Sequence, residues 1–239
     1  LERSSYGVLK LFNYFLNDFG TALAPMQVFA PEELPKSAAD IATMRVSVRA
    51  DQSSGFLFVN NHVRGYSMKP HPEVQFRIAL GNKSILTIPA RPVAVPADSY
   101  FIWPLRMKIG SVTMSYSTAQ PMCRMTQGNT TVWIFSEVPG IKAEFAFPQN
   151  EVKFVTAEHG TKRQLGDAVV ISDLVAGLTP VTSIAGDHGP KNEIVLLSRD
   201  QAAEITKVTA EGADHLVVSR AEAFSNQHTM TLRSLDDPH

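Results

Sequence analysis

The pattern of apolar and polar positions divides the chain into a helical beginning and a long β-rich remainder. Residues 4–24 carry apolar side chains at helical spacing, a serine pair precedes them and Pro25 follows them, as expected at the two ends of a helix. Residues 45–49 (RVSVR) alternate polar and apolar side chains, which is typical of a half-buried strand. We therefore predict an N-terminal helix followed by a mainly β chain.

Short apolar runs bounded by turn residues recur at intervals of about ten residues, a spacing typical of a β-sandwich. Residues 55–64 (GFLFVNNHVR) form the clearest run, because a glycine precedes it and two asparagines close it. Beyond residue 150 aromatic residues become scarce, and only Phe154 and Phe224 remain. We predict a larger, jelly-roll-like β-sandwich over residues 25–150 and a smaller β domain over residues 151–239.

The helix carries more apolar residues than one packing surface requires. They occupy eight positions: Val8, Leu9, Leu11, Phe12, Phe15, Leu16, Phe19 and Leu23. This set is wider than the stripe of about 100° that faces a single core. We expect one face to pack on the sandwich and the rest to meet an absent domain or a second copy of the chain. The alternative is that the whole helix packs on its own domain.

Charge and composition exclude several classes of partner. The 22 basic and 23 acidic residues give a net charge of −1 and are interspersed, which argues against a nucleic-acid or anionic-membrane surface. No apolar run reaches the roughly 20 residues that cross a bilayer. A single cysteine, Cys123, excludes an intrachain disulfide but leaves the compartment open, including a periplasmic or extracellular one.

Six residues are candidates for binding carbohydrate. Three are aromatic and three are polar residues at the end of a predicted strand: Tyr100, Trp103, Trp133, Asn61, His62 and Arg64. Aromatic faces stack on sugar rings, and residues at strand ends often carry function. The alternatives stay open, because aromatic residues in apolar strands usually belong to the core and asparagines usually form turns.

Chemistry-bearing motifs are otherwise scarce. His62 and His71 lie nine residues apart, a separation that matches no common metal-binding motif. The chain contains no G-x-S-x-G, G-x-G-x-x-G or P-loop sequence. We therefore predict no metal, no cofactor and no catalytic residue.

Several strings resemble, in the same order, the region that follows the catalytic barrel in bacterial β-galactosidases of glycoside hydrolase family 35. The resemblance covers about residues 6–147 and is carried by a helical segment and five strand-like strings: residues 6–20, 55–61 (GFLFVNN), 88–96 (IPARPVAVP), 100–104 (YFIWP), 117–121 (STAQP) and 138–145 (VPGIKAEF).

The resemblance implies a parent enzyme that cleaves terminal β-galactosides with retention of configuration. This chemistry needs two carboxylates about 5 Å apart, and in the family both are glutamates on a (β/α)₈ barrel that would precede Leu1. The glutamates of the family-like region do not match those motifs: Glu32, Glu33, Glu73, Glu137 and Glu144. Because the chain begins Leu1-Glu2-Arg3 without an initiator methionine, we expect it to belong to a longer or processed product.

The expected function is therefore that of a non-catalytic, C-terminal region of a β-galactosidase-like hydrolase. Residues 1–24 would leave the upstream barrel, and the sandwich would support that barrel and contribute to carbohydrate binding. The expected partners are the barrel, carbohydrate and a second copy that docks through the helix. Two alternatives stay open: an autonomous carbohydrate-binding module, and a small stand-alone hydrolase with an unrecognised site.

Overall fold

The computed structural model describes residues 4–79, 85–184, 190–226 and 229–234. These residues form mainly β structure preceded by one long helix, which confirms the predicted fold class. The helix α1 (Ser4–Leu23) ends where Gly20 and Leu23 carbonyls accept hydrogen bonds from Ala24 and Met26. Pro25, which lies between these two donors, cannot continue the helix.

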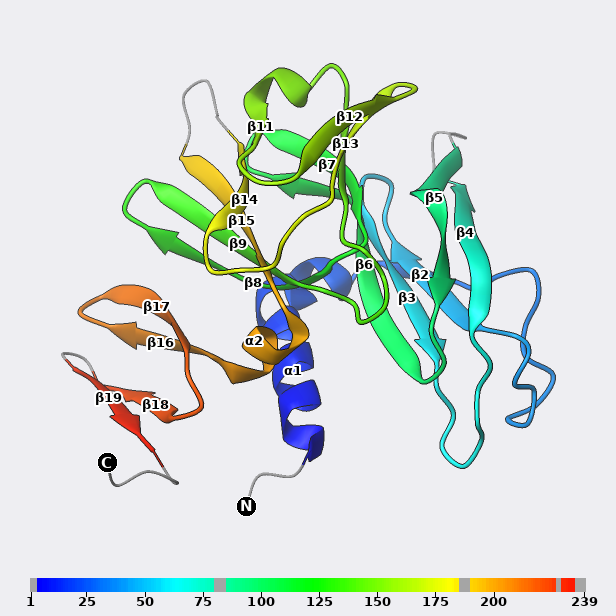
Figure 1. Cartoon of the computed structure of the whole chain (residues 1–239), viewed down its shortest axis with the longest axis horizontal. Helices are drawn as coiled ribbons and strands as arrows, with labels where there is room; N and C mark the ends of the chain where they lie inside the picture. Colours follow the sequence, from blue (N-terminus) through cyan, green and yellow to red (C-terminus); the bar gives the residue numbers. More distant parts are fainter. Residues whose placement is uncertain (1–3, 80–84, 185–189, 227–228, 235–239) are drawn as a thin grey trace.

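Two sheets make up the body of the molecule (Figure 1). In spatial order, the large sheet consists of β1 (Gln27–Phe29), β2 (Arg45–Ala50), β3 (Gly55–Asn61), β6 (Ser99–Ile109), β7 (Val112–Ser117), β10 (Phe145–Pro148), β13 (Ala168–Ser172) and β12 (Thr161–Leu165). The small sheet consists of β11 (Val155–Ala157), β14 (Pro180–Ile184), β15 (Lys191–Leu197), β9 (Thr130–Ser136) and β8 (Gln120–Gln127).

The remaining elements are ribbons and short helices. The two-stranded ribbons are β4 (His71–Ala79) with β5 (Ile85–Val95), β16 (Ile205–Ala210) with β17 (Ala213–Val218), and β18 (Glu222–Ser225) with β19 (Met230–Arg233). A 3₁₀ turn (Val152–Phe154) precedes β11. The helix α2 (Arg199–Glu204) begins with a capping box, in which Ser198 and Gln201 bond each other's backbone N–H.

Three apolar clusters hold these layers together. The inner faces of the two sheets form the largest cluster, which includes Phe56, Phe145 and Ile194. The ribbon β4–β5 covers the outer face of the large sheet, where Trp103 lies. On the outer face of the small sheet, Ile134 packs with residues of α1, α2 and β16.

The helix α1 closes one side of the sandwich. Phe15 and Phe19 join the cluster between the sheets, and both rings contact Phe56 of β3, at 5.2 and 6.1 Å between ring centroids. Leu11, one turn earlier, joins the cluster outside the small sheet. The helix therefore lies across the rim of both sheets, beside β8.

The strand pairing corrects the predicted boundary near residue 150. β15 pairs in parallel with β9, and β13 pairs with β10. Residues 155–197 therefore contribute strands to both sheets instead of forming a separate module. From Ile205 onward, the described strands pair as the ribbons β16–β17 and β18–β19 and join neither sheet, at the side of the molecule where the C-terminus lies (Figure 1).

Candidate functional site

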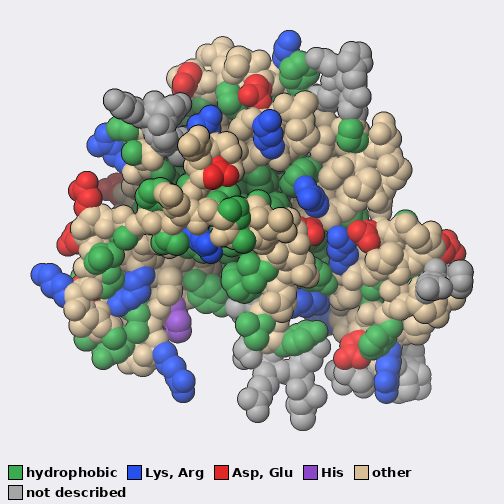
Figure 2. Space-filling model, turned by 180° about the vertical axis from the view of Figure 1, so that it is seen from behind, with side chains coloured by type: hydrophobic (Ala, Val, Ile, Leu, Met, Phe, Trp, Pro, Cys, Tyr) green, Lys and Arg blue, Asp and Glu red, His purple; other side chains and the backbone are tan. Residues whose placement is uncertain are grey.

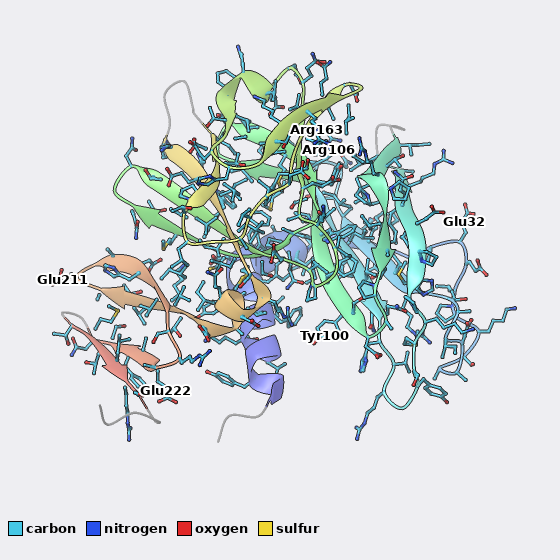
Figure 3. The ribbon with its side chains drawn as sticks, in the orientation of Figure 1. Glu32, Tyr100, Arg106, Arg163, Glu211 and Glu222 are labelled. Carbon is cyan, nitrogen blue, oxygen red and sulfur yellow. The ribbon has the colours of Figure 1, made fainter. Side chains whose placement is uncertain are left out.

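The end of β3 and the start of β6 bring most of the predicted polar candidates together. The two strands are antiparallel, with Asn61 opposite Ser99 and Asn60 opposite Tyr100. The loops that leave β3 and enter β6 therefore lie at the same end of these two strands, which is the end where Tyr100 is labelled in Figure 3. We call this end of the large sheet the strand-end edge.

Asn61 is fully buried and ties these loops together. Its Nδ2 donates to the carbonyl oxygens of Lys69 and Pro96, at 2.9 and 2.8 Å. Its Oδ1 lies 3.2 Å from Nε2 of His71. Both ends of the amide are occupied, so Asn61 shapes the loops and presents nothing to a ligand.

His62 and Tyr100 lie on the protein surface at the strand-end edge. His62 Nδ1 is 3.3 Å from Oδ1 of Asp98, and its ring meets Tyr100 edge-on at 6.5 Å. Tyr100 is 44% exposed. An exposed ring beside a carboxylate and an imidazole can stack on the apolar face of a sugar and bond its hydroxyls. Arg64 is exposed in the adjacent turn between Val63 and Tyr66, and no ion pair of Arg64 is found among the described residues.

The two tryptophans belong to the core, which corrects their candidacy as sugar-stacking residues. Trp103 is fully buried and stacks on Phe101 at 4.6 Å. Trp133 is 5% exposed, and its Nε1 donates to Oδ1 of Asn192 at 2.9 Å. Both indole faces are covered by protein, so neither can receive a sugar ring in this fold. Asp98, which the sequence did not single out, lies beside His62, whose ring contacts Tyr100.

A second functional feature is the outer face of α1. Among the helix side chains that the structure describes, which do not include Val8, four are buried: Leu11, Phe15, Phe19 and Leu23. Four others are exposed large apolar or aromatic residues: Tyr6, Leu9, Phe12 and Leu16. We call Leu9, Phe12 and Leu16 the apolar stripe, because their spacing of three and four places them on one helical face. Hydrophobic side chains gather in the lower centre of the face shown in Figure 2.

Polar contacts along the helix hold the apolar stripe in a fixed orientation. The Tyr14 hydroxyl accepts a hydrogen bond from the Lys207 N–H at 2.9 Å, and burial raises the pKa of this phenol. Asp18 accepts from the backbone N–H of Arg124, and Lys10 donates to the carbonyl oxygen of Ala203 at 3.3 Å. The helix is thus tied to β8, α2 and β16.

Metal chemistry finds no support in the described part of the chain, where no three His, Cys, Asp or Glu side chains come close enough to hold an ion. Within the same ranges, no helix has the length and apolar character needed to cross a membrane. Comparison with protein-family models and with curated proteins found no match for this chain.

Proposed function

We propose that this chain is the non-catalytic, C-terminal region of a β-galactosidase-like glycoside hydrolase, and that it braces the catalytic barrel through the apolar stripe of α1. The observation that carries the proposal is a helix fixed along one face that still exposes Leu9, Phe12 and Leu16 beside that face. Fully burying an exposed side chain of this size contributes about 1.5–3 kcal/mol. These three are 36–57% exposed, so a covering partner would gain roughly half of that amount from each. A contiguous exposed apolar patch usually marks an interface.

The glutamates of this region support a structural role. Glu144 Oε1 accepts hydrogen bonds from the Ala90 N–H at 2.9 Å and from the Tyr116 hydroxyl at 2.7 Å. The carboxylate thereby links the ribbon β4–β5 to the large sheet. Together with the ordered family-like strings between residues 6 and 147, this favours a region that supports catalysis carried out elsewhere.

The upstream reading frame provides the first test. It should encode a barrel with two glutamates at strand ends, and its absence would end the proposal. The barrel, produced separately, should gain thermal stability when this chain is added. Leu9→Ser combined with Phe12→Ser should abolish that gain. Val175→Ser combined with Leu178→Ser should preserve it, because these residues are exposed apolar positions outside α1.

Two outcomes would contradict the bracing role. The first is turnover of a chromogenic β-galactoside by this chain alone, which would place catalysis within it. The second is equal stabilisation of the barrel by the wild type and the Leu9 and Phe12 double variant. A second copy of the chain could cover the apolar stripe in place of the barrel, and sedimentation of the chain alone tests this alternative. A dimer that is lost in the Leu9 and Phe12 double variant would assign the stripe to a second copy.

A second candidate function, an autonomous carbohydrate-binding module, is favoured by the exposed ring of Tyr100 beside His62, which contacts Asp98. Neutral galactosides would bind this edge without the barrel. Tyr100→Ala should then weaken binding, whereas Tyr66→Ala, a similarly exposed tyrosine, should not. An equal effect of the two variants, or no binding at all, would contradict the binding module and leave bracing as the one proposed function.

A further inference from the structure

A pocket of about 320 Å³ lies between β5, the segment 140–144 and the pair β12–β13. This volume is at the lower end of the range of about 300–1,000 Å³ that is typical of sites for small molecules. Arg163, which lines the pocket, is labelled near the top of the molecule in Figure 3, above Tyr100. The pocket is therefore distinct from the strand-end edge and from the apolar stripe.

The inner part of the pocket is mostly apolar. Ile141, Ala143 and Val170 line it and are buried. Glu144 lines it as well, and one of its carboxylate oxygens already accepts two hydrogen bonds, from Ala90 and Tyr116. The other oxygen, Oε2, has no hydrogen bond to the described residues and remains an acceptor for a ligand hydroxyl.

The charged lining has an excess of cations. Arg91, Lys142 and Arg163 line the pocket with two acids, Glu144 and Asp173. Arg163 Nη2 lies 3.0 Å from Oδ2 of Asp173, so the opposite charges of this pair neutralise each other. No ion pair of Arg91 or Lys142 is found within the described ranges. The three cations and two carboxylates leave a formal charge of +1 (3 − 2).

We propose that this pocket binds a small hydroxylated carboxylate, of the chemical class of a sugar acid. The guanidinium of Arg91 and the ammonium of Lys142 would hold the carboxylate, since planar guanidinium groups bond carboxylates through two parallel N–H donors. Glu144 Oε2 and the hydroxyl of Ser172 would bond ligand hydroxyls, and the carbon skeleton would lie on Ile141 and Val170. The inference does not depend on the bracing role, because every group belongs to this chain.

The test is a titration of the full chain with galacturonate, compared with galactose as the neutral analogue. Chemical-shift changes of ¹⁵N-labelled amides should concentrate in residues 90–94 and 140–144. We expect a dissociation constant near 1 mM for galacturonate, rising by about tenfold in Arg91→Gln and in Lys142→Gln. Higher salt should weaken the complex, because the ion pairs at an open rim are screened.

Arg77→Gln is the matched control, because it removes an exposed arginine from the same ribbon outside the pocket. It should bind galacturonate as tightly as the wild type does. Equal binding of galactose and galacturonate would overturn the proposal, as would an equal loss in all three variants. Absence of shifts in the two segments at about 50 mM galacturonate would overturn it as well. Since Arg91 and Lys142 are both exposed, unchanged thermal unfolding should show that their variants fold.

Discussion

Two phenylalanines of α1 test whether its two faces play different roles. Phe15 is fully buried and its ring lies 5.4 Å from Phe19 and 5.2 Å from Phe56. Phe12, three positions earlier, is 41% exposed. Truncating a buried phenylalanine to alanine costs about 3–5 kcal/mol, so Phe15→Ala should lower the free energy of unfolding by that amount. Surface substitutions usually change it by less than about 0.5 kcal/mol, so Phe12→Ala should cost under about 1 kcal/mol.

Urea unfolding followed by tryptophan fluorescence measures both variants. Trp133 reports on this region, because its ring lies 6.4 Å from that of Phe19. With an m-value of about 3 kcal/mol/M, the midpoint should fall by about 1–1.7 M in Phe15→Ala and by under about 0.3 M in Phe12→Ala. Equal losses in the two variants would refute the assignment of Phe12 to a free face and remove the basis of the docking proposal.

Three further perturbations test other parts of the fold. Gly110→Ala should destabilise the fold more than Gly128→Ala. Both glycines have a positive φ, but only the methyl group added at residue 110 would meet Asn192, the hydrogen-bond partner of Trp133. Unfolding of the two variants followed by tryptophan fluorescence measures the difference. Burial raises the pKa of Cys123 to about 12, from an ordinary thiol value of 9.0. The contribution of the protonated thiol to the free energy of unfolding should therefore be complete below pH 9.0 and should decrease as the pH rises from 9.0 to about 12. Urea midpoints at alkaline pH should fall less in Cys123→Ala. Asn61→Ala should cost about 1–3 kcal/mol in thermal or urea unfolding, because two partly buried carbonyls lose their donor.

Local patterns predicted elements well because they depend on neighbours in sequence. The helix was expected over residues 4–24 and spans Ser4–Leu23. The alternating segment at 45–49 lies within β2, and the run at 55–64 contains β3. In each case, the geometry of a few adjacent residues determines both the pattern and the element.

Long-range pairing could not be predicted in the same way. The boundary near residue 150 was inferred from composition, yet Ile194 pairs with Trp133 across a parallel ladder. No local periodicity carries information on that register. Strand β6 gives a second case, because Arg106 has a φ of 48°. Leu105 therefore faces the ribbon β4–β5 while Met107 faces the cluster between the sheets, contrary to simple alternation.

The candidate site depended on the same kind of long-range information. Tyr100 and Trp103 lie in one strand, three residues apart, and the sequence offered both as exposed rings. Their opposite outcomes arise because β4–β5 folds over the outer face of the large sheet, where Phe76 meets Trp103 edge-on at 5.9 Å. Tyr100 stays exposed because it lies at the end of its strand. Which face of a strand a distant ribbon covers is not encoded within that strand.

The apolar stripe, the strand-end edge and the pocket use different elements of one framework, and this separation makes their tests independent. The stripe lies on α1, Tyr100 lies at the start of β6, and Arg91 lies on β5. Free-energy effects of distant sites without shared partners add within about 0.5 kcal/mol. A variant that combines Phe12→Ser with Arg91→Gln should therefore lose barrel stabilisation and galacturonate binding to the same extents as the two single variants. A loss larger than their sum would mean that α1 and β5 communicate through the large sheet, and that the chain transmits ligand binding to its docking face.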